Sequence, residues 1–595
     1  MVYSTLEDGF PGDYYHFASG EWMAEHYTDA VWNRSIESYD RLLDLNQMTF
    51  PPIDSYKVHV PRMSDTPDEK LREIVEDELI TYLEGHTKEF PEYQERLHEE
   101  LDVIKDIGFA NYFLLARKVV KWCQDNKICV EARGSANSCL VCFLLGVTQT
   151  DPVAWNIDFF RFISRERKTP PDIDLDIDDS RRGEVLEFLS REFPSCQIGT
   201  FSKVGITIDE ETGEERGSVL VSYLSYLRRK AKAEAERKIE ELGGKKKDVD
   251  PLAKEIFKQN YGDITTIDDV KKISKRDYKG LKRIAEMDSV YKSYGVHDAG
   301  VLLGTEEVDL DDVVPRLLVA SSDTTVTAFD MDTLEAIGLL KFDILGQSSL
   351  RVMSLCQQLM GVTNPNDFSW IPNDDKKATA ILRSGLKDNG IFHFGSAYKA
   401  RGGKEMGIKS TKDTVLSIAA YMPGCVKSGQ KDRYVESRKN SRLRKEMIEE
   451  ARQLHPIIAD VLSDTNGVMV YQDHPLGILK KLGMSTADVN VAYKVLKDSG
   501  KGSAERNKVR LDQLRKTFDV LCEEKGVTDP DKVWDMVAGF MGYGFNKAHS
   551  TGYGIRAYRT AYLKAHYPLE FMAATLQVWS GKKVGGRDME KIYVT

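Results

Sequence analysis

The feature that most constrains this chain is the run Pro170-Pro-Asp-Ile-Asp-Leu-Asp-Ile177. Aspartate alternates with isoleucine and leucine, which predicts a strand whose alternate side chains point to the same face. Asp172, Asp174 and Asp176 therefore share one face, and the apolar residues between them face a core. Like charges this close raise one another's pKa unless a cation neutralises them. A divalent cation with oxygen ligands is the natural partner of such a strand.

Two other interpretations of this run are weaker. A solvent-facing edge strand also carries acids, but three aspartates after a proline pair are unusual for one. A calcium loop needs glycine at its sixth position and glutamate at its twelfth, where this chain has Ile177 and Gly183. The remaining interpretation is metal-assisted phosphoryl or nucleotidyl chemistry, which often needs one more carboxylate from elsewhere in the chain.

The best candidate for that carboxylate is Asp343, in the apolar run Gly338-Leu-Leu-Lys-Phe-Asp-Ile-Leu-Gly346. Lys341 stands two residues earlier, on the same face of a strand. Taken alone, an incidental acid at the end of a helix or strand is the simpler interpretation. Upstream, a polar turn at residues 131–138 precedes an apolar helix. Backbone N–H groups at that helix start, with Arg133 beside them, can bind a phosphate, although a loop before a helix is common.

The remaining periodicities give a coarse map of the chain. They predict helices over 66–124, strands within 141–177, a hairpin turn at 207–214, a long helix over 218–247 and mainly helices after residue 350. Cys139 and Cys142 lie in an apolar run that is typical of a buried helix. A second Cys or His pair at zinc-site spacing does not accompany them, so core packing is the better interpretation.

Length and charge limit the class of protein. A chain of 595 residues predicts about three to five domains, and its sequence contains no run of roughly 18 apolar residues that could span a membrane. The net charge of −11 argues only weakly against nucleic-acid binding, because DNA meets one face of a protein and not its average. Basic clusters at 228–238 and 271–283 are most often solvated helix faces.

Several motifs in order resemble one family. They are Arg133-Gly-Ser135, Arg161-Phe-Ile-Ser-Arg-Glu-Arg167, Pro171-Asp-Ile-Asp-Leu-Asp176, Lys341-Phe-Asp-Ile-Leu-Gly346, Gly542-Tyr-Gly-Phe-Asn-Lys-Ala-His549 and Thr560-Ala-Tyr-Leu-Lys-Ala-His-Tyr-Pro568. This series resembles the catalytic alpha subunit of bacterial DNA polymerase III, a C-family DNA polymerase. The resemblance covers nearly the whole chain, in a compact form about half the length of the family.

The resemblance implies a multi-domain α/β fold. Its palm would be like that of polymerase beta and other nucleotidyltransferases, with a helical thumb and large, mainly helical fingers. The expected boundaries are an N-terminal remnant of a PHP-domain tail plus linker at 1–65, palm at 66–205 and 287–350, thumb at 206–286 and fingers at 351–595. Whether the short form is phage-encoded, split or engineered stays open.

The resemblance also assigns residues. Asp172, Asp174 and Asp343 would be the catalytic carboxylates and the ligands of two Mg²⁺ ions, with Asp176 as a neighbour on the same face. The expected nucleotide-binding residues are Arg133, Gly134, Ser135, Arg161, Arg167, Lys341, Lys547 and His549. The basic clusters then have a reason to face a duplex, which gives the expected DNA-binding residues Arg228, Arg229, Lys230, Lys271, Lys272, Lys275 and Arg276.

Some positions depart from the family pattern. Tyr421-Met-Pro-Gly424 lacks an expected arginine, and Phe392-His-Phe-Gly-Ser396 replaces a Gln- and Glu-containing motif. An arginine pair expected after Asp488 is absent, and nearby lysines are candidate substitutes. These departures affect the expected nucleotide contacts of the fingers and leave the three carboxylates intact.

The implied function is template-directed DNA synthesis in DNA replication, by two-metal nucleotidyl transfer from a dNTP to a primer 3′-hydroxyl. The alternatives are a non-catalytic paralogue that binds primer–template and a metal-dependent nuclease or phosphohydrolase. Expected partners are primer–template DNA, dNTPs and other replisome subunits or a separately encoded C-terminal part, with no membrane. The expected location is the cytoplasm of a bacterial or phage-infected cell.

Overall fold

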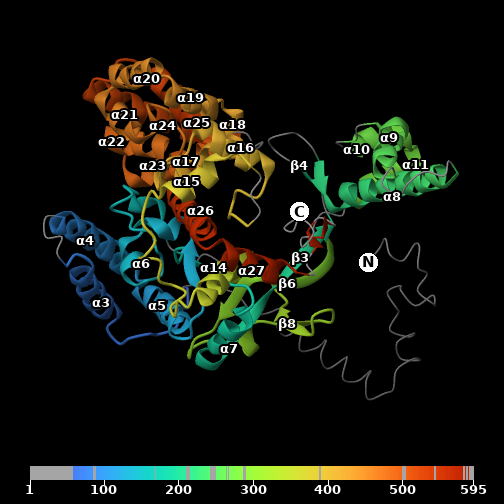
Figure 1. Ribbon diagram of the computed structural model, residues 1–595, viewed down its shortest axis with the longest axis horizontal. Helices are drawn as coiled ribbons and strands as arrows, with labels where there is room; N and C mark the ends of the chain where they lie inside the picture. The colour runs from blue at the N-terminus through green and yellow to red at the C-terminus, as the bar shows by residue number, and fades with distance from the viewer. Residues whose placement is uncertain are drawn as a thin grey trace. The chain divides into compact units, whose positions relative to one another are not determined.

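A computed structural model describes residues 58–84, 89–165, 167, 169–204, 206–208, 215–241, 249–262, 264, 267–285, 290–386, 390–498, 504–541, 544–580, 583–584 and 587–588 (Figure 1). Contacts divide the chain into two compact units. Among the described residues, the first unit lies within 199–296 and 316–338, and the second lies within 59–198, 297–315 and 339–595. The predicted N-terminal segment lies almost entirely outside the described residues.

The second unit begins with three helices, α3 (Pro67–Tyr82), α4 (Phe90–Ile107) and α5 (Ala110–Asp125). Helix α3 begins at a proline, whose missing N–H is not needed in the first turn, and has acids in that turn. Helix α4 ends at Gly108, whose φ of 75° lies in the left-handed region that favours glycine. These helices confirm the prediction over residues 66–124, apart from the connections between them.

A seven-stranded sheet has the order β1-β2-β9-β6-β3-β8-β7. Its strands are β1 (Val130–Arg133), β2 (Asp174–Asp178), β3 (Ser195–Val204), β6 (Val290–Leu303), β7 (Arg316–Val319), β8 (Thr324–Thr327) and β9 (Leu340–Gln347). Strand β2 pairs antiparallel with β1 and parallel with β9. The two acidic segments predicted from the sequence therefore lie on neighbouring strands.

Short helices and turns lie between these strands in the chain. They are α6 (Leu140–Leu144), α7 (Arg182–Glu192), α12 (Leu310–Val313) and α13 (Met331–Ala336), with 3₁₀ turns at Gly134–Ser138 and Phe159–Arg161. The prediction of several strands within residues 141–177 is wrong for the part of this range that the structure describes, where Asp174–Asp178 is the one strand. Short apolar runs do not distinguish a strand from a buried helical turn, and here one of them became α6. Cys139 and Cys142 are buried at that helix, as predicted.

The first unit contains the hairpin of β4 (Ile206–Ile208) and β5 (Glu215–Gly217) and a set of helices. The helices are α8 (Ser218–Glu241), α9 (Val249–Tyr261), α10 (Ile267–Ile273) and α11 (Lys275–Ala285). Leu220, Leu227 and Val270 are among the buried residues that hold these helices together. The predicted hairpin turn itself lies mainly outside the described residues, between the two paired strands.

The rest of the second unit is helical, as predicted. Its elements are α14 (Ser348–Leu359), α15 (Lys376–Arg383), α16 (Ala397–Met406), α17 (Thr411–Ala420), α18 (Pro423–Lys427), α19 (Gln430–Lys439), α20 (Ser441–Leu454), α21 (Pro456–Val461), α22 (Asp473–Leu482), α23 (Thr486–Asp498), α24 (Ala504–Lys525), α25 (Pro530–Met541), α26 (Lys547–His566) and α27 (Pro568–Trp579), followed by the two-stranded β10 (Lys583–Val584) and β11 (Arg587–Asp588). Two hydrophobic clusters form its core. Within the described residues no helix is long and apolar enough to cross a membrane.

Helix α26 connects the helical region to the sheet. It packs against α15 and α17 on one side and against β1 and the Gly134–Ser138 turn on the other. Gly554 allows the close approach to α17, because a Cβ there would lie 2.5 Å from the Val415 Cα. One helix thus contacts both the helical core and the strand beside the acidic motif (Figure 1).

Candidate active site

Strand β2 presents its acids as the alternation predicts, with one exception. Ile173, Leu175 and Ile177 are buried in the core, and Asp174 and Asp176 share the opposite face. Asp172 precedes the strand and its side chain is 73% exposed. The prediction that all three aspartates belong to one strand face is therefore wrong at Asp172, where the chain is still leaving the proline pair.

Asp174 lies in a charged and poorly solvated position. Its partner in the antiparallel register is Arg133 on β1, and Arg133 Nε is 3.3 Å from Asp174 Oδ2. Burial raises the pKa of Asp174 to about 6; Arg133 opposes this shift, and the charges of Asp343 and Asp172 add to it. Arg133 therefore does not offset the burial and the neighbouring negative charges that raise the pKa of Asp174.

Asp343 lies on the neighbouring strand β9, whose parallel register places Ile344 opposite Leu175. Lys341 Nζ donates to Asp343 Oδ2 at 3.0 Å, which confirms the predicted shared face. The other oxygen, Asp343 Oδ1, is buried and makes no hydrogen bond within the described part of the chain. A buried carboxylate oxygen without a donor is costly unless a cation reaches it.

The three predicted ligands fit a divalent cation in their chemistry. All three offer carboxylate oxygens, the donor type that Mg²⁺ prefers, and the site contains an unpaired buried oxygen and a raised pKa. Each carboxylate is paired with a cation of the chain. Arg133 pairs with Asp174, Lys341 pairs with Asp343, and Arg167 Nη2 is 3.4 Å from Asp172. Among the residues that the structure describes, no group of three His, Cys, Asp or Glu side chains is gathered closely enough to hold a metal ion.

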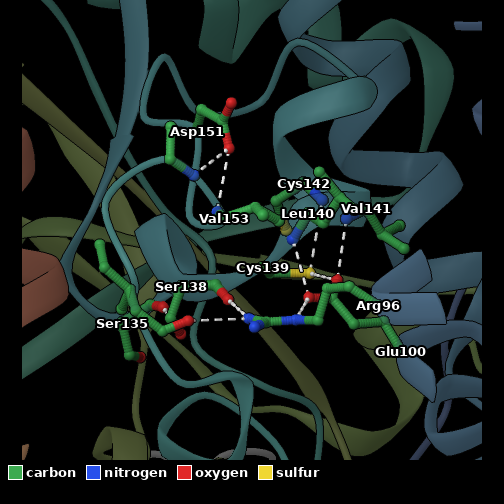
Figure 2. A network of polar contacts seen from close by, with 12 residues as sticks. Arg96, Glu100, Ser135, Ser138, Cys139, Leu140, Val141, Cys142, Asp151 and Val153 are labelled. Carbon is green, nitrogen blue, oxygen red and sulfur yellow. Dashed lines mark hydrogen bonds and ion pairs between the residues drawn. The ribbon is translucent and has the colours of Figure 1, made fainter. Parts of the chain in front are cut away.

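The turn Gly134–Ser138 follows Arg133 directly. Gly134 has a φ of 75°, and glycine populates this left-handed region without a steric penalty. Arg96 on α4 stabilises the turn. It donates to the Ser138 carbonyl at 2.8 Å and to Glu100 Oε1 at 2.7 Å (Figure 2). Ser138 in turn donates its hydroxyl to the Ser135 carbonyl at 2.7 Å.

The helix start after this turn is not free for a phosphate, contrary to the sequence-based expectation. Glu100 is fully buried and accepts hydrogen bonds from the backbone N–H groups of Leu140 at 3.0 Å and Val141 at 2.9 Å (Figure 2). A carboxylate of the chain therefore satisfies the start of α6. The four-residue spacing of Arg96 and Glu100 predicts their pairing on one helix, but their contacts with the turn and with α6 lie about 40 residues away in the chain and leave no local signal.

Two predicted nucleotide contacts are engaged with the helical region. Arg161 donates to Gln472 Oε1 at 2.8 Å and lies over the ring of Tyr493. Lys547, the first residue of α26, donates to Asp464 Oδ2 at 2.9 Å and to the Asn156 carbonyl at 3.1 Å. Burial alone would raise the pKa of Asp464, but a hydrogen bond from His474 and the charge of Lys547 hold this pKa well below its usual range.

His549 lies in an aromatic cluster on α26. Its ring centroid is 4.2 Å from that of Tyr553, which also interacts with Arg133. Burial lowers the pKa of His549 to about 4, and the positive charges of Arg133 and Arg556 add to the shift. His549 is therefore neutral at pH 7 in this structure, and the cations around it provide a local positive field.

Sequence reasoning missed two buried residues beside the acidic strand, Arg556 and Glu131. Arg556 on α26 bonds both Asp176 on β2 and Glu131 on β1. The available signal was helical spacing, because His549, Tyr553 and Arg556 recur at intervals of four and three residues.

The predicted DNA-binding residues lie in the first unit, on α8, α10 and α11. Their side chains are all exposed: Arg228, Arg229, Lys230, Lys271, Lys272, Lys275 and Arg276. Lys272 forms an ion pair with Asp269, and Arg228 lies over the ring of Phe257.

Comparisons with known proteins find two matching families along the chain. Residues 69–346 match the family described as the bacterial DNA polymerase III alpha NTPase domain, and residues 349–519 match the bacterial DNA polymerase III alpha subunit finger domain. All three expected carboxylates and their three cation partners fall within the first match.

Named relatives point the same way. The chain is 29% identical to the DNA polymerase III subunit alpha of Aquifex aeolicus over 94% of its length and 49% of that relative. It is 28% identical to the subunit of the same name from Escherichia coli strain K12 over 87% of its length and 43% of that relative. The chain spans about half the length of the curated relatives it matches.

Proposed function

Because the chain belongs to the family of bacterial DNA polymerase III alpha subunits, with both matched domains present, we propose that it is a DNA-directed DNA polymerase. The reaction is transfer of a nucleotidyl group from a dNTP to the 3′-hydroxyl of a primer, directed by a template strand. The observation that carries the proposal is the juxtaposition of Asp174 and Asp343 on neighbouring strands, with the pKa of Asp174 raised to about 6. Such a pair of carboxylates suits divalent-cation chemistry at a phosphoryl group.

Asp174 and Asp343 are the residues that would hold two Mg²⁺ ions, with Asp172 completing the set. When bound, the ions would lower the pKa of the primer hydroxyl and offset charge on the leaving pyrophosphate. Arg133 pairs with Asp174 and Lys341 with Asp343 in the absence of substrate, and both cations would transfer to the phosphates of the nucleotide when it binds. Arg167 does the same for Asp172.

The proposed architecture divides the chain into the parts of a polymerase. Residues 66–205 and 287–350 would form a palm of the polymerase beta type, 206–286 a thumb and 351–595 the fingers. Helix α26 would bring His549 and Lys547 to the triphosphate, and Lys547 would exchange Asp464 for a phosphate oxygen. Arg161 and the turn at Gly134 and Ser135 would complete the nucleotide site.

Primer–template DNA and dNTPs are the proposed partners. The exposed lysines and arginines of α8, α10 and α11 support contact with a duplex, because solvent-exposed cations can bind the phosphates of a DNA backbone. The resemblance to a polymerase subunit also leads us to propose further replisome partners.

The test is primer extension by the full chain with a labelled primer on a longer template, all four dNTPs and Mg²⁺. We expect products longer than the primer that end at the template terminus. A polymerase adds nucleotides only opposite their complements, so omitting one dNTP should stop extension at a defined base. Shortening of the primer without extension would instead favour the nuclease alternative, and unchanged primer that is nevertheless bound would favour the non-catalytic paralogue.

A further inference from the structure

Arg556 is a fully enclosed cation that joins α26 to two strands of the sheet. Its side chain is 1% exposed. Arg556 Nη2 donates to Asp176 Oδ2 at 2.8 Å, and Nε donates to Glu131 Oε1. Glu131 and Asp176 are direct partners in the β1–β2 register, so a single guanidinium spans the two strands at one position.

This ion cluster is continuous with the candidate active site. Asp176 Oδ1 lies 3.7 Å from Arg133 Nε, and the same Nε lies 3.3 Å from Asp174 Oδ2. Charges therefore alternate from Glu131 through Arg556, Asp176 and Arg133 to Asp174. Arg133 is shared between two aspartates, and Arg556 gives Asp176 a second and closer cation.

The same arginine sets the position of one face of α26. His549, Tyr553 and Arg556 lie on that face at helical spacing, and the Arg556 guanidinium carbon is 5.2 Å from the centre of the Tyr553 ring. Phe392 covers the guanidinium from the helical region, with its ring centre 4.9 Å away. If α26 rotated or slid along the strands, Arg556 would lose two buried carboxylates at once.

Stability alone is a weak explanation for this cluster. Enclosing three charges costs desolvation free energy, and apolar side chains of similar volume commonly stabilise a fold as well or better. What the cluster provides is a defined position, because a bidentate arginine restricts both distance and orientation. Arg559, three residues further along the same helix, donates to Gln149 and lies 3.9 Å from Glu131 on β1, whereas Arg556 contacts both Glu131 and Asp176.

We propose that Arg556 is a positioning residue for nucleotide binding. It seats α26 on β1 and β2, so that Arg133, Tyr553 and His549 form one preorganised surface for the triphosphate of an incoming nucleotide. This inference rests on the proposed polymerase function. A helix that is seated only part of the time binds nucleotide in proportion to the seated fraction, whereas saturating nucleotide restores the seated state. Loss of Arg556 should therefore raise KM for dNTP and leave kcat nearly unchanged.

The experiment compares three variants in single-nucleotide incorporation on a primed template. Arg556→Lys keeps one charge without the bidentate geometry, and Arg556→Gln removes the charge. Because Arg556→Gln leaves two buried carboxylates with too little positive charge and can unfold the chain, the third variant is the neutral set Glu131→Gln, Asp176→Asn and Arg556→Gln. The matched control is Arg438→Gln with Asp413→Asn, which removes a partly buried ion pair inside the helical region.

We expect KM for the dNTP to rise about tenfold in the neutral set and about threefold in Arg556→Lys, with kcat within about twofold of wild type. The control should lower the melting temperature and leave KM unchanged. An unchanged KM in a folded neutral set, or a fall in kcat larger than the rise in KM, would overturn the positioning role.

A second measurement separates this inference from the proposed function. Hydrogen exchange of the α26 amides does not depend on catalysis, and it should be faster in the neutral set than in wild type while the α17 amides keep their protection. Wild type without any extension activity would refute the proposed function alone. Equal α26 exchange in wild type and the neutral set would refute the seating of the helix by Arg556, whatever the activity.

Discussion

Arg133 and Asp174 face each other across the β1–β2 pair, with the guanidinium Nε 3.3 Å from the carboxylate. The two residues come from segments about 40 positions apart, a strand that ends in a glycine turn and a strand that begins after a proline pair. Their pairing does not fully compensate Asp174, because burial, Asp343 and Asp172 together hold its pKa at about 6. The pKa of Asp174 therefore depends on its burial and on the charges of the other residues of the candidate site.

Asp174→Asn should stabilise the fold at neutral pH when divalent cations are absent. The pKa of Asp174 is higher in the folded chain than the ordinary value of 3.8, so its ionisation destabilises the fold as the pH rises from about 4 to about 6. Asparagine cannot ionise, and the variant should exceed wild type by about 3 kcal/mol in free energy of unfolding at pH 7.5, and by only about 0.5 kcal/mol at pH 4. Chemical denaturation in the presence of a chelator measures the free energy of unfolding at both pH values.

The same comparison with Mg²⁺ provides a control. A cation bound by the ionised carboxylates should raise the melting temperature of wild type above pH 6 and have a smaller effect on Asp174→Asn. A variant that is less stable than wild type at pH 7.5 in chelator would show that Arg133 compensates Asp174 completely.

Glu100→Gln should destabilise the turn that carries Ser135. The substitution keeps the shape of the side chain but removes the charge that pairs with Arg96 and caps α6 in a fully buried position. Breaking a buried ion pair by removing one partner costs about 3 kcal/mol. Glu76→Gln, in an exposed pair with Arg72, is the matched control and should change the free energy of unfolding by less than about 0.5 kcal/mol. Equal effects of the two substitutions would show that Glu100 contributes little as a cap.

Substituting Arg228, Arg229 and Lys230 by Gln should weaken duplex binding and its dependence on salt. The slope of log affinity against log salt changes by about 0.9 for each phosphate that is no longer neutralised, so the slope of the triple variant should be shallower by about two to three. Fluorescence anisotropy between low and physiological salt measures this. The matched control is substitution by Gln of three exposed or half-exposed cations on α3 and α5, namely Lys70, Arg72 and Lys121. This control should leave the slope unchanged. A wild-type slope in the α8 variant would remove these residues from the DNA interface.

The acidic strand was predictable because its information is local. Alternation of Asp with Ile and Leu sets the strand, and the spacing of Lys341 and Asp343 sets their shared face. The start of α3 at Pro67 is local in the same way. The resemblance then supplied the order of motifs, which periodicity alone does not contain.

What escaped prediction depends on pairs that are distant in sequence. Arg556 and Asp176 are separated by 380 positions, and an ion pair over that distance leaves no periodic trace in either segment. Glu100 occupies amides 40 residues away, so the start of α6 looked free for a phosphate. The short apolar runs after residue 141 gave the wrong secondary structure because their length suits a strand and a buried helical turn equally well.

The most direct test of the account is incorporation of one correct nucleotide by Asp174→Asn and Asp343→Asn, with primer–template binding measured in parallel. The matched control is Asp178→Asn, on the same strand, whose carboxylate caps a turn at Ser180 and can be replaced by an amide oxygen. We predict that both site variants lose at least about a thousandfold in incorporation rate while binding DNA within about threefold of wild type, and that the control keeps its activity. Incorporation at the wild-type rate by either site variant would contradict the assignment of these two carboxylates.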